Sequence, residues 1–503
     1  MQALISVYDK TGLDKICPIL IDAGYKIIST GGTFEYLKKI GIKVDSVYSI
    51  TGESEILNGR VKTLHPKIHA GILADTENVS HLEDLNNLNI DTFDIVINNL
   101  YPFEEVVSRK NSTDAQIIEN IDIGGPAMLR AAAKNYKRVT VLIDPKDYEM
   151  LAEKITKGEI DLPTRKILAK KVFQFVSKYD KAIENYLSNK SEDDFKNRID
   201  ISYHKISDLR YGENPHQKGA IYSNVTNGIA NSKLLNGKEM SYLNYLDADA
   251  AFTAVNSFPN HCVSIVKHTN SCGLSYSSNQ LDSYKRALNG DPVSAYGGIV
   301  GFNTELEEKT AKEMSSMFFD VIIAPSYTMK ALEILNKKKN TRILTSNVQK
   351  EFFQFRTING GLLYQEIDNK KDLIKNWDFV TKNKPNKNEI ENWAFAWTCT
   401  KFVKSNAIII TSEKSIIGIG SGQPNRINSV NLAIAKAKSY LTENSILASD
   451  AFFPFSDSIE LASKNNIRNI IQPGGSIRDH EVISEANRHN IKMIFTNTRH
   501  FSH

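Results

Sequence analysis

Short apolar segments alternate with segments of helical periodicity through the first part of the chain, and this alternation constrains the fold more than any other feature. Residues 3–7, 26–29 and 139–143 have the pattern of strands, whereas residues 13–23 and 127–135 have that of helices. This order is typical of a parallel sheet with helices on both faces. We therefore predict an α/β fold with a doubly wound parallel sheet for this region.

Composition and charge exclude several classes of protein. With 503 residues, 41% hydrophobic and 24% charged, the chain resembles an ordinary globular protein of more than one domain. No apolar run reaches the roughly 18 residues of a membrane span, and the N-terminus lacks the pattern of a signal peptide. The net charge of +4 comes without a basic stripe interleaved with aromatic residues. We expect a cytoplasmic protein that binds small anions and neither membranes nor nucleic acid.

The cysteines do not form a recognisable disulfide or zinc pattern. They are scattered along the chain, and no Cys-x-x-Cys pair occurs. His268 and Cys272 together would supply only two ligands, which is too few for zinc. We therefore expect no zinc site and no disulfide framework among Cys17, Cys262, Cys272 and Cys399.

Two glycine-rich segments have features of anion sites. Residues 29–33, Ser-Thr-Gly-Gly-Thr, lie between a predicted strand and a predicted helix at 34–40, where free N–H groups and the helix dipole favour phosphate. Residues 58–71 carry five basic or titratable side chains and are predicted to converge on an anion. Glycines at such a position also form plain turns, and a basic loop can simply be solvated, so both alternatives stay open at this point.

Polar side chains follow two further apolar segments. Residues 93–103 read as a buried strand whose carboxyl end carries amides and Tyr101, where ligand contacts are expected in such a sheet. Asp122 and Lys134 flank a Gly-Gly entry to a helix. Each of these charges, taken singly, also fits a helix cap or a surface position.

Together with residues 6–13, these segments resemble the IMP cyclohydrolase domain of the bifunctional AICAR formyltransferase/IMP cyclohydrolase family. The resemblance implies a methylglyoxal-synthase-like fold and an intramolecular ring closure that depends on orientation and charge stabilisation. The residues that it implies around the reacting groups are Lys62, Tyr101, Asp122 and Lys134. Those that it implies around phosphate and ribose are Ser6, Lys10, Ser29, Thr30, Gly31, Gly32, Thr33, Arg60, Lys62 and Thr63. Tyr8 departs from the family, which has a small hydroxyl residue there.

A polar segment marks the predicted domain boundary. The long helical pattern at 162–187 is followed by residues 188–194, which have no apolar anchor. We predict a first domain at residues 1–194 and a second at 195–503. No internal repeat is visible in the sequence.

The segment 262–273 is the strongest candidate for catalysis in the second domain. A β-rich apolar run ends at Lys267 and His268, and turn-forming Asn, Ser and Gly residues follow. Because a neighbouring ammonium disfavours a second positive charge, His268 is predicted to be neutral and able to accept a proton. Lys267 is suited to face the negative charge that develops on a carbonyl oxygen. A solvated strand end with two ordinary polar residues is the alternative for this dipeptide alone.

Further segments carry polar motifs, and with 262–273 they resemble the AICAR formyltransferase domain of the same family, in one order along nearly the full chain. They lie at residues 208–217, 236–245, 289–298, 404–426, 449–457, 472–476 and 497–503. The resemblance implies two cytidine-deaminase-like α/β subdomains without zinc and a homodimer with active sites at the subunit interface. The small molecules that it implies are 10-formyltetrahydrofolate, AICAR, FAICAR and IMP.

The resemblance also assigns roles residue by residue. Lys267 and His268 match the catalytic pair, and Asn406 matches a residue beside the transferring formyl group. The implied nucleotide-binding residues are Arg210, Tyr211, Arg426 and Arg499, and the implied folate contacts are Phe452 and Asp457. A potassium ion is implied near Ser405 and Asp450. Ser271 stands where the family usually has Pro.

These observations predict a bifunctional enzyme that formylates AICAR and then cyclises FAICAR to IMP with loss of water. Two alternatives remain open from the sequence: a formyltransferase whose cyclohydrolase half has lost activity, and a non-catalytic nucleotide-sensing module. The second explains poorly why Lys267 and His268 lie at a strand end.

Overall fold

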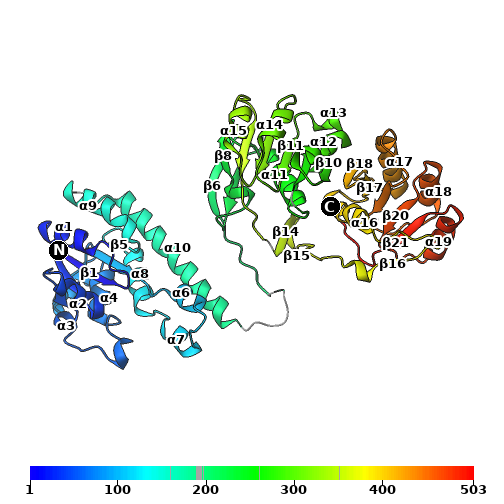
Figure 1. The fold of residues 1–503 in the computed structure, drawn as a ribbon. Coiled ribbons are helices and arrows are strands. Elements are labelled where there is room, and N and C mark those ends of the chain that lie inside the picture. The colour runs from blue at the N-terminus through cyan, green and yellow to red at the C-terminus, as the bar shows by residue number, and fades with distance from the viewer. Residues whose placement is uncertain (159, 189–194, 196, 260, 351) are drawn as a thin grey trace. The chain divides into compact units, whose positions relative to one another are not determined.

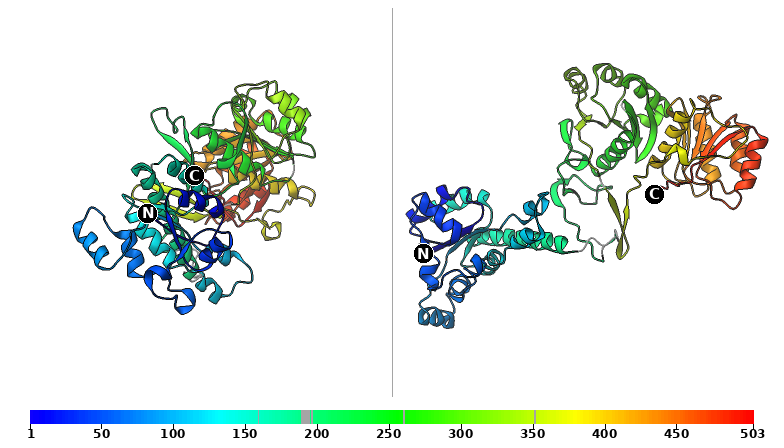
Figure 2. Two further views of the ribbon diagram at one scale, coloured as in Figure 1. Left: turned by 90° about the vertical axis from the view of Figure 1, so that its left-hand side faces the viewer. Right: turned by 60° about the horizontal axis from the view of Figure 1, so that its bottom comes forward.

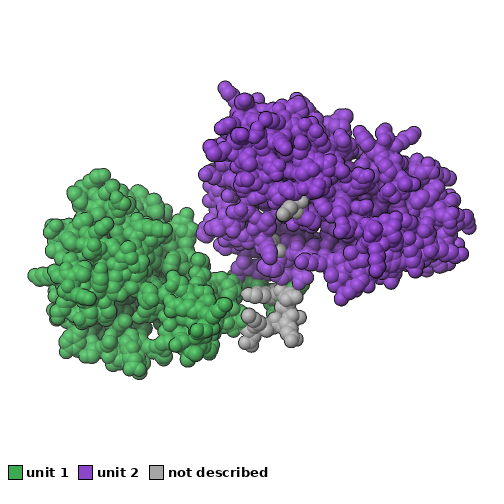
Figure 3. Space-filling model, in the orientation of Figure 1, with its two compact units in different colours: residues 1–198 green, residues 199–503 purple. Residues whose placement is uncertain are grey.

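A computed structural model describes residues 1–503 except 159, 189–194, 196, 260 and 351. The chain forms two compact units, residues 1–198 (unit 1) and residues 199–503 (unit 2), coloured separately in Figure 3. The predicted boundary after residue 194 falls on a residue that lies outside the described ones. None of the helices in the described part of the chain combines the length and apolarity needed to cross a bilayer.

Unit 1 is built on a five-stranded parallel sheet in the order β3-β2-β1-β4-β5. Successive residues of the central strand face opposite layers, because Leu4 packs in one hydrophobic core and Ala3 and Ile5 in the other. Both faces are therefore buried under helices (Figure 1), and the predicted doubly wound sheet is confirmed. The strands are β1 (Gln2–Val7), β2 (Lys26–Ser29), β3 (Asp45–Ser46), β4 (Ile95–Asn99) and β5 (Thr140–Leu142).

Two helices of unit 1 begin within segments predicted to be loops. Helix α2 starts at Gly31, because φ of +54° at this glycine turns the chain directly into the helix. Helix α4 starts inside the basic segment, where Pro66 occupies the first turn and His65 accepts a hydrogen bond from the Lys67 amide. The helices are α1 (Leu13–Asp22), α2 (Gly31–Lys39), α3 (Tyr48–Thr51), α4 (Pro66–Leu73), α5 (Val79–Asn87), α6 (Phe103–Ser108), α7 (Asp114–Glu119), α8 (Gly124–Lys134), α9 (Tyr148–Thr156) and α10 (Leu162–Leu187).

Unit 2 contains a mixed sheet of 12 strands in the order β16-β21-β20-β19-β17-β18-β10-β9-β11-β12-β13-β8. The strands of one half are β8 (Lys233–Asn236), β9 (Cys262–Lys267), β10 (Asn270–Tyr276), β11 (Ile299–Phe302), β12 (Val321–Ala324) and β13 (Arg342–Thr345). Those of the other half are β16 (Asp378–Phe379), β17 (Ile408–Ser412), β18 (Ser415–Gly420), β19 (Ile446–Ser449), β20 (Asn469–Gln472) and β21 (Lys492–Phe495).

The two halves of this sheet repeat one topology. In each half an antiparallel hairpin is followed by three parallel strands, and an earlier strand closes the outer edge. We call residues 233–345 the first repeat and residues 378–495 the second repeat. They meet where β10 pairs with β18 through Ser275 and Ser415, which we call the repeat junction. The order of elements is thus duplicated although no repeat is visible in the sequence, because the side chains of the two copies differ.

Matching helices accompany the strands of both repeats. The first repeat contains α11 (Tyr242–Val255), α12 (Gln280–Gly290), α13 (Pro292–Ala295), α14 (Glu308–Met314) and α15 (Met329–Leu335). The second contains α16 (Ile390–Cys399), α17 (Arg426–Ala437), α18 (Asp457–Lys464) and α19 (Asp479–Arg488). This duplication supports the predicted pair of α/β subdomains.

Two small antiparallel ribbons complete unit 2. One pairs β6 (His204–Leu209) with β7 (Gly219–Ser223), and the other pairs β14 (Phe353–Ile358) with β15 (Gly361–Glu366). The β14–β15 ribbon lies in the connection between the repeats and projects from the large sheet (Figures 1 and 2).

Candidate functional site

The loop after β1 is held by one side chain at the end of β4. Asn99 Oδ1 accepts hydrogen bonds from the amides of Tyr8 (2.7 Å) and Asp9 (2.9 Å), and its Nδ2 donates to the Asp9 carbonyl (2.9 Å). Ser6 pairs in register with Asn98, so Ser6 and Lys10 lie at the carboxyl edge of the sheet. This is the edge at which doubly wound sheets bind ligands.

The hydroxyl groups of Ser29 and Thr33 fasten β2 and α2 to β1. Ser29 Oγ donates to the Ile5 carbonyl (2.7 Å), while Thr33 Oγ1 accepts from the Val7 amide (3.0 Å) and donates to its carbonyl (2.9 Å). Both hydroxyl groups therefore donate their protons to backbone carbonyls of β1 rather than to a ligand. The groups that remain to receive an anion are the first amides of α2, next to Thr30, Gly31 and Gly32.

Lys62 and Thr63 lie between two helix N-termini. A Cβ built on Gly31 would be 3.3 Å from Lys62 Nζ, and one built on Gly124 would be 3.1 Å from Thr63 Oγ1. The Lys62 ammonium therefore adjoins the start of α2, and the Thr63 hydroxyl adjoins the start of α8. Arg60 instead is exposed and pairs with Glu119, with Nε 3.2 Å from Oε1. Of the basic side chains predicted to converge on an anion, Lys62 lies next to a helix N-terminus, whereas Arg60 is paired with Glu119.

Asp122 is partly buried immediately before α8. Its Oδ1 accepts a hydrogen bond from the Gly125 amide (2.8 Å). Burial raises the pKa of Asp122, although the Gly125 amide, the charge of Lys62 and the Tyr101 amide lower it in part. A Cβ on Gly125 would lie 2.5 Å from Asp122 Oδ2, so only glycine fits there. Lys62, Tyr101 and Asp122, three of the predicted catalytic residues, therefore come together.

Lys134 lies at the other end of the same helix. It is the last residue of α8 and exposed, whereas Asp122 precedes the first residue. Ten residues of helical rise separate the two ends by about 15 Å. Within one chain, Lys134 is therefore not part of the cluster around Asp122.

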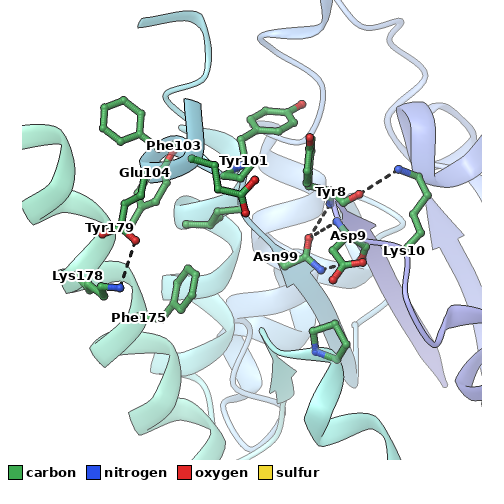
Figure 4. Close-up of a pocket in the computed structure, with 14 residues that line it drawn as sticks. Tyr8, Asp9, Lys10, Asn99, Tyr101, Phe103, Glu104, Phe175, Lys178 and Tyr179 are labelled. Carbon is green, nitrogen blue, oxygen red and sulfur yellow. Dashed lines mark hydrogen bonds and ion pairs between the residues drawn. The ribbon is translucent and has the colours of Figure 1, made fainter. Parts of the chain in front are cut away.

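A cavity of about 770 Å³ opens beside this cluster (Figure 4). Tyr8 and Lys10 line it from the loop after β1, and Tyr101 from the segment after β4. The Tyr8 and Tyr101 rings meet edge to face, with centroids 5.7 Å apart. Tyr179 of α10 lines the opposite wall and accepts a hydrogen bond from the Asp122 amide (2.8 Å).

Sequence reasoning missed two of the groups that organise this cavity. Burial raises the pKa of Tyr179 to about 12, so its phenol stays protonated and also donates to the Asn120 carbonyl (3.2 Å). A tyrosine in a long amphipathic helix carries no signal of such a contact. Asn99 carried a weak signal, as an amide at the end of a predicted strand.

In unit 2, Lys267 and His268 lie at the tip of the β9–β10 hairpin. Lys267 pairs with Asn270 and its Nζ donates to the Tyr296 carbonyl (2.9 Å), while the side chain of His268 is exposed. The turn contains only His268 and Thr269, so the predicted turn through 270–273 is wrong. The glycine there serves packing, because a Cβ on Gly273 would lie 1.8 Å from the Ala287 carbonyl of α12.

A buried carboxylate contacts this turn from helix α11. Asp247 Oδ2 accepts from the His268 amide (2.9 Å) and Oδ1 from the Thr269 amide (2.5 Å). From the sequence, Asp247 is predicted only to belong to a helix. A spacing of 21 residues between an acid and a turn has no local signature.

A second polar group lies at the same edge of the sheet as Lys267. Asp320 precedes β12, and its two oxygens accept from Asn244 Nδ2 and Arg342 Nη1, each at 2.6 Å. The sequence showed Asp320 only as a carboxylate before a strand. Because β9, β11, β12 and β13 are neighbours, these residues and Lys267 share one rim.

Asn406 lies on the same rim of the large sheet as Lys267, which in the second repeat is the end opposite the hairpin turn. Its Nδ2 donates to the carbonyls of Gln423 (2.9 Å) and Pro424 (3.1 Å), and its Oδ1 accepts from Arg426 Nη2 (2.6 Å). Arg426 is buried, and its guanidinium also contacts Ser449 and the buried Asp450. The positive charge of Arg426 is therefore balanced within the protein.

Hydrogen bonds connect the two candidate groups across the repeat junction. Ser421 Oγ donates to Asn270 Oδ1 (3.1 Å), and Asn270 Nδ2 donates to the His268 carbonyl (2.9 Å). On the other side, Gln423 Nε2 donates to the Ser421 carbonyl (3.3 Å), and Gln423 accepts from Asn406. The predicted pair Lys267–His268 and the predicted Asn406 are thus brought to one region.

The C-terminal tail is fastened beside Asn406. Ser405 Oγ donates to Asp450 Oδ2 (2.5 Å). The Ser405 amide donates to the Ser502 carbonyl (2.8 Å), and the Ser502 amide donates to Ser405 Oγ (3.2 Å). The buried His500 contacts Asp372 Oδ2 through Nε2 (2.8 Å). A cavity of about 1260 Å³ adjoins this tail.

The remaining predicted residues are more exposed. Arg210 stacks on Tyr211, with its guanidinium carbon 4.7 Å from the ring centroid, and Arg499 lies 4.3 Å from that of Phe501. Phe452 is 37% exposed, and Asp457 is exposed at the start of α18. Within the described residues, no group of three or more His, Cys, Asp or Glu side chains could hold a metal ion.

Comparisons with known proteins cover the whole chain. The family described as AICARFT/IMPCHase bienzyme matches residues 132–436, and the MGS-like domain matches residues 12–127. Curated proteins named "Bifunctional purine biosynthesis protein PurH" from Caldicellulosiruptor saccharolyticus, Aquifex aeolicus and Dictyostelium discoideum are each 46% identical. Each alignment covers 100% of this chain and 99%, 100% and 100% of the respective relatives. The solved structure titled "Crystal structure of ForH" covers 37% of this chain and 95% of its own, at 33% identity and a TM-score of 0.35.

Proposed function

Because this chain belongs to the AICARFT/IMPCHase bienzyme family, it is a bifunctional enzyme of purine biosynthesis, and we propose how its two units divide the two reactions. Unit 2 carries out AICAR formyltransfer from 10-formyltetrahydrofolate. Unit 1 carries out the IMP cyclohydrolase reaction. The observation that carries this division is the position of two separate polar clusters, one at the sheet edge of each unit.

In unit 2, His268 is the general base and Lys267 the electrostatic partner. The exocyclic amine of AICAR attacks the formyl carbon, and His268 accepts the proton that this amine loses. Lys267 stabilises the oxyanion of the tetrahedral intermediate. The bond from the formyl carbon to N10 of the folate then breaks, and N10 takes a proton, which leaves FAICAR and tetrahydrofolate. The fixed positions of Lys267 and the His268 turn support these roles.

Asn406 orients the formyl group in this proposal. Its amide is held from both ends by Arg426 and by the Gln423 and Pro424 carbonyls. The hydrogen bonds across the repeat junction keep it near the His268 turn, and such orientation is a large part of acyl-transfer catalysis. Arg426 acts here through Asn406, because its own charge is balanced by Asp450.

In unit 1, Lys62, Tyr101 and Asp122 surround the ring closure. The carboxamide nitrogen attacks the formyl carbon within one molecule, and water leaves. Asp122 is suited to exchange a proton with these groups, because burial raises its pKa towards the range in which a carboxyl can act as both acid and base. Lys62 and the start of α2 would bind the anionic parts of the nucleotide. For Lys134 we keep the implied role in ring closure as a proposal, and substitution of Lys134 followed by an assay of FAICAR cyclisation tests it.

The remaining implied residues are proposed as ligand contacts. In unit 1 they are Ser6, Lys10, Ser29, Thr30, Gly31, Gly32, Thr33, Arg60 and Thr63. In unit 2 the nucleotide contacts are Arg210, Tyr211 and Arg499, and the folate contacts are Phe452 and Asp457. The stacked pairs Arg210–Tyr211 and Arg499–Phe501 suit an anionic aromatic ligand.

Asp450, at the implied potassium position, already contacts protein groups through both of its carboxylate oxygens. One oxygen of Asp450 pairs with Arg426, and the other accepts from Ser405. We assign no step to potassium. We propose instead that Asp450 orients Arg426 and Ser405.

We also propose that the enzyme acts as a homodimer in the cytoplasm. The β14–β15 ribbon exposes Phe355, Ile358, Leu362 and Leu363, and apolar side chains gathered on one ribbon suit contact with a second copy. The four cysteines are buried free thiols, as expected in a reducing compartment.

The division of reactions is tested by one pair of variants in the full-length protein. Lys267→Ala/His268→Ala is expected to abolish release of tetrahydrofolate from AICAR and 10-formyltetrahydrofolate, yet to cyclise supplied FAICAR at the parental rate. Lys62→Ala is expected to do the reverse. Absorbance reports both products. Parental formyl transfer by the double variant, or unchanged cyclisation by Lys62→Ala, would contradict the assignment.

A further inference from the structure

The turn that carries His268 has a backbone conformation that its residues disfavour. φ is +54° at His268 and +57° at Thr269, so both residues are left-handed, as in a two-residue type I′ hairpin turn. Such turns favour Asn and Gly, which tolerate this conformation. A β-branched residue such as Thr269 is a clear outlier in it. Something else must hold the turn.

Asp247 supplies that restraint. Its two carboxylate oxygens accept from the amides of His268 and Thr269, at 2.9 and 2.5 Å. The side chain is buried, with 9% of the residue exposed, and it projects from α11, which packs on β9 and β11. Ser241 and Asn244 form a capping box that fixes the start of this helix. The carboxylate is therefore held rigidly beneath the turn.

We propose that Asp247 is a positioning residue for formyl transfer, which holds the His268–Thr269 turn in its left-handed conformation and so fixes the imidazole against the substrate amine. This inference rests on the proposed role of His268 as the base. Asp247 touches only the backbone of the turn and acts through His268. A side chain that restrains both amides of a catalytic turn restricts where the imidazole can point.

The second repeat shows that the fold itself does not require this restraint. Its equivalent hairpin turn, between β17 and β18, has Glu413 and Lys414 at φ of +47° and +60°. Among the described residues, no carboxylate accepts from the amides of this turn. The repeated topology therefore forms the turn without such an acid, and the acid is found where the turn carries His268.

The test compares Asp247→Asn with a matched control in the full-length enzyme. An asparagine keeps one acceptor oxygen but presents an NH2 group to the second amide, so the turn loses a hydrogen bond and gains a repulsion. We expect kcat for formyl transfer to fall about 10- to 100-fold, with KM for AICAR changed much less. Asp249→Asn, on an exposed position of the same helix, is the control and is expected to keep the parental kcat. The rate of FAICAR cyclisation by unit 1 serves as a measure of the concentration of active enzyme in every sample.

A rescue variant separates positioning from general damage. Thr269→Gly removes the strain of the left-handed conformation, because glycine adopts a positive φ freely. In the Asp247→Asn background it is expected to restore kcat by about tenfold, since the turn then holds its shape with fewer restraints. A structural defect in α11 would not respond to a change in the turn.

The outcomes are distinct. Parental kcat in Asp247→Asn overturns the inference, and so does a loss of kcat that Thr269→Gly leaves unchanged. His268→Ala is measured alongside, because retained formyl transfer in that variant overturns the proposed role of His268 itself. Loss of activity in His268→Ala together with full activity in Asp247→Asn leaves the proposed function standing and removes only the role of Asp247.

Discussion

Ser421 donates a hydrogen bond of 3.1 Å to Asn270, and this bond ties the second repeat of unit 2 to the turn that carries His268. Asn270 in turn donates to the His268 carbonyl. The relation links two segments 151 residues apart in the chain. It makes the geometry of the turn that carries His268 dependent on both repeats.

Ser421→Ala is therefore expected to lower kcat/KM for formyl transfer. A neutral hydrogen bond contributes about 0.5–1.5 kcal/mol, which corresponds to about 2- to 10-fold in rate. Steady-state kinetics with AICAR and 10-formyltetrahydrofolate measure the change, and cyclisation by unit 1 should stay at its parental rate. Ser412→Ala, which alters a contact with Thr442 beside the turn of the same hairpin, is the control. Equal losses in the two serine variants would argue against a specific role for the Ser421–Asn270 bond.

The partly buried carboxyl of Asp122 is expected to reduce stability at neutral pH. Burial raises its pKa in the folded state above the usual value of 3.8, so the folded protein holds this proton more tightly than the unfolded chain. The stability that the protonated group contributes is complete below about pH 3.8 and is lost as the pH rises through the raised pKa. Because asparagine does not ionise, Asp122→Asn should not lose stability in this way as the pH rises.

Thermal unfolding of unit 1 checks the sign. Asp122→Asn should raise the Tm at pH 7, and the gain should shrink as the pH falls towards 4. About 2–4 °C would correspond to roughly 1 kcal/mol for a unit of this size. FAICAR cyclisation should be lost in the same variant. If instead Asp122→Asn has a lower Tm than the parent at pH 7, and this deficit shrinks towards pH 4, the ionised carboxylate stabilises unit 1 and the prediction is wrong.

Tyr8 is expected to position Tyr101 for ring closure. Their edge-to-face contact is of a kind that contributes about 0.5–1.5 kcal/mol. Tyr8→Ala should therefore reduce kcat/KM for FAICAR about 2- to 10-fold, whereas Tyr8→Phe keeps the ring and should stay near the parent. Comparable losses in both variants would assign the effect to the Tyr8 hydroxyl rather than to ring packing.

Arg426 and Asp450 form a buried ion pair whose loss should be costly. Asp450→Leu leaves the guanidinium of Arg426 without a counter-charge and is expected to destabilise unit 2 by about 3–5 kcal/mol. The double variant Arg426→Leu/Asp450→Leu should recover much of this, because no unpaired charge remains. Denaturant unfolding of unit 2 measures both. A double variant less stable than the single one would mean that packing, rather than charge, dominates at this position.

Periodicity predicted much of the fold, and the failures have local physical causes. The strands of unit 1 and the helix 162–187 follow from alternating apolar segments, which tertiary contacts reinforce. The turn through 270–273 was wrong because Gly273 permits close packing of α12, and a glycine of this kind looks the same in sequence as a turn glycine. The early start of α4 reflects Pro66 at a helix N-terminus, where proline is favoured.

The candidate sites were predicted only as far as short motifs reach. Lys267, His268 and Asn406 were identified from strand ends and from a family resemblance. Asp247 and Tyr179 were missed because their contacts join segments 21 and 57 residues apart, and the order of residues along a chain carries no sign of such pairing. The pair of subdomains was predicted only through the family resemblance, since the two copies share their strand order and not their side chains.

A chain that builds one topology twice can specialise each copy. The hairpin of the first copy bears an imidazole at its tip, whereas the matching tip of the second bears Glu413 and Lys414. In the proposed mechanism the second copy needs no acid–base group at this tip and contributes the amide of Asn406 from its opposite rim, held there by Arg426. Two copies of one topology can therefore place unlike side chains along a single continuous sheet.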